Sequence, residues 1–77
     1  MKVKITKPDS TLYDGEANVV DLPGTGGRFE ILNDHAPIIS SLRHGTLRIV
    51  TAEGEKSFEI RGGVVKGEHN DLTILVQ

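Results

Sequence analysis

The chain has no cysteine and no tryptophan, and alanine occurs only three times in its 77 residues. Without cysteine there can be no disulfide, no thiolate metal site and no cysteine nucleophile. A chain of this length buries only roughly 60% of the surface that its unfolded state exposes, so its stability alone is marginal. The length therefore predicts one domain, residues 1–77, that gains stability from a partner.

Long apolar runs and a large charge of one sign are also absent. The opening MKVKITKPD lacks the apolar core of a signal peptide or a membrane span, so we expect no direct membrane insertion. The formal net charge is -2. Proteins that bind nucleic acids usually carry a basic face, so we expect no nucleic-acid partner.

The residues that are abundant favour β-strands. Valine, isoleucine and threonine occur 7, 7 and 6 times, and these β-branched residues prefer strands to helices. Short stretches of alternating apolar and polar residues are separated by turn residues throughout. The sequence therefore predicts an all-β fold, a flattened two-sheet β-sandwich or barrel of about eight to ten short strands.

The alternation also places the strands. We expect a first strand around Val3 and Ile5, a second near Leu12 and Tyr13, and a third over residues 16–22 that the Pro23-Gly24 pair and Gly26-Gly27 stop. The segment after Pro37 is predicted to be either a strand or irregular structure. Further expected elements are a strand with Phe29 and Ile31 on one face, a hairpin around residues 52–55, and a second hairpin around residues 69–71.

The residues that could carry chemistry form no catalytic or metal-binding pattern. His35, His44 and His69 are the only histidines, and no carboxylate motif accompanies them as a zinc site would require. No glycines frame Ser40 and Ser41 as a nucleophile elbow. The glycines at 24, 26 and 27 lack the lysine of a phosphate-binding loop. We therefore expect no enzyme activity and no cofactor, and an exposed turn of an interaction module at residues 24–27.

The segment LPGTGGRFEILNDHAPIISSLRHGTLRI, Leu22 to Ile49, resembles a stretch of the epsilon subunit of rotary F-type ATP synthases. That stretch reads LPG, a glycine-containing turn, FGIL, HAP, two apolar residues and G-x-L-R-I. The similarity continues at both ends of the chain, in KVKITKP, GGVV and LTILV. The whole chain is thus similar to the N-terminal β-sandwich of epsilon.

The resemblance implies a function, two partners and a location. It implies a non-catalytic central-stalk subunit of a proton-translocating ATP synthase, which couples proton-driven rotation to ATP synthesis. The subunit would be monomeric alone, present once in the hetero-oligomeric complex, and peripheral on the cytoplasmic face of the inner, energy-transducing membrane. Contacts with the gamma subunit carry over to Lys7, His35, Ala36, Pro37 and Ser40. Contacts with the polar loops of the c-ring carry over to Thr25, Gly26, Gly27, Arg28 and Phe29.

The sequence departs from the family pattern in two residues and in its length. Glu30 stands where the family usually has glycine, which raises the question of whether the backbone there is altered. Arg28 stands where an acidic residue is common, so it would face a carboxylate of the c-ring or pair with Glu30. Most family members continue into a two-helix C-terminal hairpin, whereas this sequence stops at Gln77. If the subunit is naturally short, we expect neither inhibition by such a hairpin nor nucleotide binding, and a subunit truncated before the hairpin would have the same sequence over these residues.

Two other functions compete with this hypothesis. One is a small β-barrel enzyme in which His35 and Asp34 perform acid-base chemistry. The other is a freestanding adaptor that binds peptides at a sheet edge. An enzyme needs a pocket, and a sandwich filled by valine, isoleucine and leucine leaves little room for one.

Overall fold

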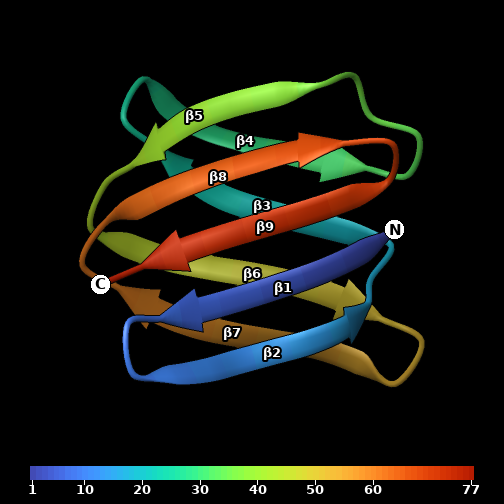
Figure 1. Ribbon diagram of the computed structural model, residues 1–77, viewed down its shortest axis with the longest axis horizontal. Helices are drawn as coiled ribbons and strands as arrows, with labels where there is room; N and C mark the ends of the chain where they lie inside the picture. Colours follow the sequence, from blue (N-terminus) through green and yellow to red (C-terminus); the bar gives the residue numbers. More distant parts are fainter.

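The computed structural model describes all 77 residues, which form nine β-strands and no helix. Figure 1 shows the strands in two layers, with the N-terminus at one end of the molecule and the C-terminus at the other. No helix is present that could cross a membrane. The strands are β1 (Lys2–Lys7), β2 (Ser10–Glu16), β3 (Val19–Gly24), β4 (Gly27–Leu32), β5 (Ile38–Leu42), β6 (Gly45–Thr51), β7 (Gly54–Ile60), β8 (Gly63–Glu68) and β9 (Asp71–Val76).

The strands pair in the order β2-β1-β9-β8-β5-β3-β6-β7, and β4 adds to β3. The front layer of Figure 1 holds β2, β1, β9, β8 and β5, and the back layer holds β4, β3, β6 and β7. One pair of residues, Gly24 and Leu42, links β3 to β5 and so joins the layers along one side. All pairs are antiparallel except β1 with β9. The predicted two-layer, all-β fold is confirmed.

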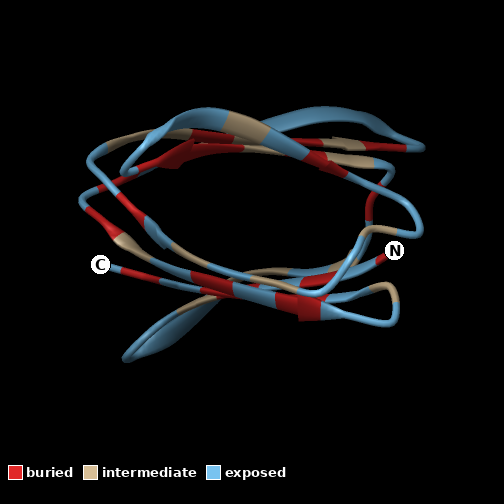
Figure 2. Ribbon diagram, turned by 90° about the horizontal axis from the view of Figure 1, so that it is seen from above, coloured by how far each residue is buried: buried red, intermediate tan, exposed pale blue.

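One apolar core lies between the layers, because alternate residues of most strands point inward. Val3 and Ile5 of β1 are fully buried, and Lys4 between them is exposed. Figure 2 shows that both layers contain buried residues. The core cluster contains fifteen buried residues, with five partly buried side chains packed against it: Leu12, Tyr13, Phe29, Ile38 and Phe58.

Most predicted strands and both hairpins are confirmed, and the segment after Pro37 is the strand β5. One boundary was wrong, because Pro23 and Gly24 do not stop the third strand but form its last two residues. The ladder between β3 and β6 ends at Asp21 opposite Arg48. Pro23 therefore lies beyond the last residue paired on that side, where the missing N–H breaks no ladder. Glu16 belongs to β2, and residues 17 and 18 connect β2 to β3.

We expect that Gly63→Ala destabilises the protein by at least about 2 kcal/mol, because the packing there leaves no room for a side chain. A Cβ atom at Gly63 would lie 2.2 Å from the carbonyl oxygen of Leu75 in the neighbouring strand. Gly26→Ala is the matched control, because a Cβ atom there meets nothing within 4 Å. Urea unfolding of both variants measures the difference. Equal stability of the two variants would contradict the close approach of β8 to β9.

Candidate functional site

Three of the residues expected to contact gamma lie in the loop between β4 and β5. His35 is partly buried, and Ala36 and Pro37 are exposed. The Nδ1 atom of His35 lies 3.0 Å from the carbonyl oxygen of Ala36, and its Nε2 atom is buried without a hydrogen-bond partner. The loop is held from the other side by Asn70, which accepts a hydrogen bond from the Asp34 N–H at 2.5 Å and donates one to the Asp34 carboxylate at 2.7 Å.

The other two residues of that predicted set lie elsewhere. Ser40 is on β5, partly buried, on the side of the strand that carries Ile38 and Leu42 toward the core. Lys7 is exposed at the last position of β1. Figure 1 places the end of β1 and the loop before β5 at opposite ends of the molecule. The predicted gamma contacts therefore do not form one cluster.

The residues expected to contact the c-ring lie around the turn between β3 and β4. Thr25, Gly26 and Gly27 are exposed. Gly27 has a φ of 128°, which disfavours any other residue. Thr25 is anchored to β5, since its N–H donates to the carbonyl oxygen of Ser41 at 3.1 Å and the two hydroxyls lie 2.9 Å apart. The turn is thus a defined, solvent-facing feature.

Arg28 and Phe29 follow the turn and are both engaged within the protein. The Arg28 guanidinium lies 3.2 Å from the Asp21 carboxylate and donates to the Thr46 carbonyl oxygen at 2.8 Å, with 48% of its side chain exposed. The alternative pairing of Arg28 with Glu30 is therefore wrong. Phe29 packs against the core. The strand β4 runs without interruption through Glu30, which is exposed, so the replacement of glycine leaves the strand regular.

Asp21 is the centre of a charged row on the outer face of the back layer. Besides pairing with Arg28, the Asp21 carboxylate lies 3.5 Å from the Arg48 guanidinium. The Arg48 guanidinium also lies 3.2 Å from the Glu55 carboxylate on β7. Hydrogen bonding to Glu55 and its charge raise the pKa of Arg48, with a smaller effect from Asp21. Glu30 is opposite Asp21 in the register of β3 and β4, so two carboxylates sit side by side there. The row extends across β4, β3, β6 and β7.

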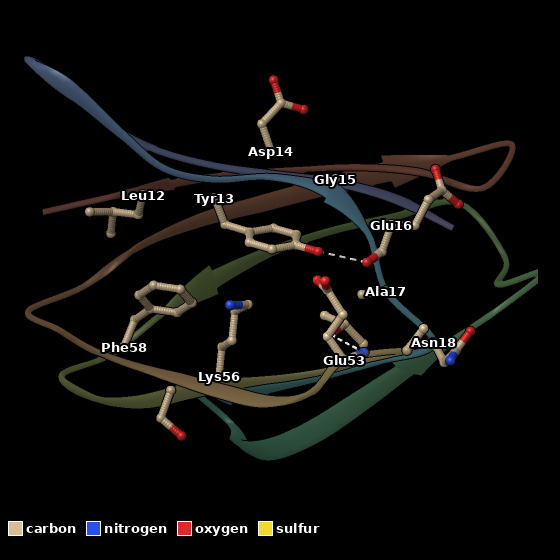
Figure 3. Close-up of a pocket in the computed structure, with 13 residues that line it drawn as sticks. Leu12, Tyr13, Asp14, Gly15, Glu16, Ala17, Asn18, Glu53, Lys56 and Phe58 are labelled. Atoms are coloured by element: carbon tan, nitrogen blue, oxygen red, sulfur yellow. Dashed lines mark hydrogen bonds between the residues drawn. The ribbon is translucent and has the colours of Figure 1, made fainter.

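A groove of about 820 Å³ lies on the open side of the sandwich, between β2 and β7 (Figure 3). Leu12 and Tyr13 of β2 face Phe58 of β7 across it. The Tyr13 hydroxyl donates to the Glu16 carbonyl oxygen at 2.7 Å, and the Tyr13 ring lies close over Gly15. None of the residues predicted to be functional lines this groove. No catalytic pair is hydrogen-bonded in it.

Sequence reasoning missed an exposed apolar patch on the outer face of the front layer. Ile39, Val64 and Leu75 are 74%, 43% and 56% exposed. Val64 is directly opposite Leu75 in the β8–β9 register, and Ile39 is diagonal to Val64 across β5 and β8. The signal was available, because the runs Ile38-Ile39, Val64-Val65 and Ile74-Leu75-Val76 force one apolar residue outward in a strand of period two.

A shallow apolar hollow of about 380 Å³ adjoins this patch. Val64 and Leu75 line it, together with Lys7 from the predicted gamma set. Pro8, Thr6 and Gln77 complete most of its wall. Lys7 therefore lies beside the apolar patch, although the other predicted gamma contacts do not.

The residues of the competing enzyme hypothesis are not arranged for acid-base chemistry. Asp34 bonds to Asn70, and no hydrogen bond connects it with His35. No three histidine, aspartate or glutamate side chains are grouped as a metal site would require.

Comparison with known proteins identifies one family over the entire chain. The family model for the β-sandwich domain of the ATP synthase delta/epsilon chain matches residues 1–77. The ATP synthase epsilon chain of Nostoc sp. is 37% identical over 99% of this chain, and that of Bordetella avium is 37% identical over 97%. These matches cover 57% and 54% of the two relatives, so the chain spans little more than half of their length.

Solved structures show the same fold. A chain in the mitochondrial ATP synthase of Euglena gracilis, in an assembly of OSCP, F1 and c-ring, superposes with a TM-score of 0.89 over 96% of this chain and 48% of its own length, at 18% identity. A chain from the central stalk and c-ring of the Tetrahymena thermophila enzyme superposes with a TM-score of 0.83 over 99% of this chain and 62% of its own length, also at 18% identity.

We expect Asp21→Asn to lower the free energy of unfolding by about 1 kcal/mol, because it removes the carboxylate that Arg28 and Arg48 share. Glu30→Gln removes the same charge from the position directly opposite. That control should leave the stability unchanged or raise it slightly, since it relieves repulsion from Asp21. Thermal or urea unfolding at low salt measures both. A larger loss for Glu30→Gln would show that Arg28 pairs with Glu30 in solution.

Proposed function

The chain belongs to the ATP synthase delta/epsilon family, in its β-sandwich domain, and from this premise we propose that it is a non-catalytic central-stalk subunit of a proton-translocating ATP synthase. It binds the gamma subunit and the polar loops of the c-ring, and so couples rotation of the ring to ATP synthesis. Residues 1–77 act as one domain, present once in the complex and peripheral on the cytoplasmic face of the energy-transducing membrane.

The observation that carries the gamma contact is the apolar patch of Ile39, Val64 and Leu75. Its three large aliphatic side chains lie on neighbouring strands with a hollow beside them. Burial of such a surface against a partner would stabilise a small domain. An interface centred on such a patch gains stability from the apolar area that it removes from water. Lys7 lines the hollow, and Ser41 lies opposite Val64, so the patch has a polar rim.

The turn of residues 25–27 supports the contact with the c-ring. It is exposed, it lies at one end of the sandwich, and its anchoring to Ser41 fixes its shape before a partner binds. A preorganised loop loses little entropy on binding. Phe29 supports the turn from the core side rather than meeting the ring, and Arg28 meets the ring with only the exposed half of its side chain.

We expect Leu75→Glu to weaken binding to the cognate gamma subunit at least tenfold, because it places a charge in the centre of an apolar interface. Leu32→Glu is the matched control. Leu32 is 53% exposed against 56% for Leu75, but it lies on β4 of the back layer. It should change the affinity less than twofold. Calorimetric titration of each variant with gamma measures the affinities, and circular dichroism checks that both are folded.

The difference between the two affinities shows which face of the sandwich binds gamma. Equal loss in both variants would show that the patch is not the gamma-binding face. Failure of the unmodified chain to bind gamma at tens of micromolar would refute the proposed function itself.

A further inference from the structure

The ends of the sandwich carry opposite charge. The loops between β1 and β2, β5 and β6, and β7 and β8 meet at one end (Figure 1). Together with the strand residues that flank them, the loops of this end hold Lys7, Arg43 and Arg61 against one carboxylate, Asp9. The loops and flanking residues of the opposite end hold two cations, Lys2 and the Met1 ammonium group that pairs with Glu16, against five side-chain carboxylates, Glu16, Asp34, Glu53, Glu68 and Asp71. We call the first of these the cationic end.

The cationic end also contains the exposed turn of residues 25–27, and Arg28 follows it one residue inside β4. Arg43, Arg61 and Lys7 are exposed and make no ion pair within the protein. Two carboxylates lie close to this end, Glu59 one residue inside β7 and Asp21 three residues inside β3. Asp21 is shared by Arg28 and Arg48, and Glu59 is hydrogen-bonded to the Thr46 hydroxyl. The charge of the three exposed cations is therefore not neutralised locally.

A notch of about 220 Å³ concentrates this charge. Arg28, Arg43 and His44 line it, and the rest of its wall is the backbone of Gly24, Gly27 and Gly45 with Pro23. The Arg43 N–H donates to the Pro23 carbonyl oxygen at 2.8 Å, which fixes the loop from β5 to β6 against the end of β3. The side chains of Arg28 and Arg43 therefore line one space, and guanidinium groups bind carboxylates through paired hydrogen bonds.

We propose that the cationic end docks on an acidic protein surface and that the notch of Arg28, Arg43 and His44 receives one of its carboxylates. The inference rests on the proposed function for the identity of that surface, the part of the rotor that faces the turn of residues 25–27. The loops of this end include no large apolar side chain, and the exposed Val64 and Leu75 beside Lys7 lie on the strands β8 and β9, in the patch proposed to bind gamma. Peripheral membrane anchors combine cations with apolar residues that enter the bilayer, so a protein carboxylate fits this end better than a lipid headgroup.

The test uses the 77-residue chain alone, with hexaglutamate as the probe. Hexaglutamate added to 15N-labelled protein at low salt should shift the amide signals of residues 24–27 and 43–45 saturably, and hexaglutamine should not. Arg43→Gln should weaken the binding at least threefold. Lys66→Gln removes the same charge from the middle of β8 and should leave the binding unchanged. Raising the salt to about 0.2 M should weaken the interaction, because exposed charges are screened within about 8 Å.

Three results would overturn the inference. The first is a shift that Arg43→Gln and Lys66→Gln reduce equally, since the binding would then follow net charge alone. The second is the absence of any saturable shift. The third is sedimentation with phosphatidylglycerol vesicles that depends on Arg43 while hexaglutamate gives no shift, which would assign the notch to a phosphate headgroup. None of these measurements uses another ATP synthase subunit, so this inference and the proposed function can fail separately.

Discussion

The structure depends on one seam where the two layers are joined by backbone hydrogen bonds. At this seam Gly24 pairs with Leu42, the Arg43 N–H donates to the Pro23 carbonyl oxygen, and the Thr25 N–H donates to the Ser41 carbonyl oxygen. The opposite side of the sandwich has no such bonds, because β2 and β7 are both edge strands with the groove between them. The seam therefore fixes how the layers lie on each other, and the core fills the space that it defines.

The same seam brings the candidate binding residues together. It holds the turn of residues 25–27 beside the loop from β5 to β6, although these segments are more than fifteen residues apart in the sequence. The notch between Arg28 and Arg43 exists because β3 and β5 end at this point. Displacement of the seam would therefore change the shape of the end and the packing of the core at once, so core packing helps to hold the shape of this binding surface.

The alternation of residues was enough to predict the layers, because a strand with one buried face has period two. It predicted the two hairpins for the same reason, since a short turn fixes which strands pair. It could not predict the end of β3, because whether Pro23 breaks a ladder depends on which strand lies beside it. It also could not predict that Arg28 pairs with Asp21 rather than Glu30, since that choice depends on the register of β4 against β3 and on the nearby Thr46 carbonyl oxygen. The family resemblance distributed the expected gamma contacts over residues that the fold separates, because matching positions in a sequence does not show where they lie in space.

The two candidate surfaces differ in their chemistry, and the difference fits two kinds of contact. The patch of Ile39, Val64 and Leu75 is apolar, so binding there depends on buried area and changes little with salt. The cationic end has exposed charges, so binding there is orientation-dependent and weakens as salt rises. A subunit that stays bound to one partner and must also be oriented toward a second partner needs two surfaces of different chemistry. The apolar face would hold the subunit in place, and the opposite charges of the two ends would select which end faces the acidic surface.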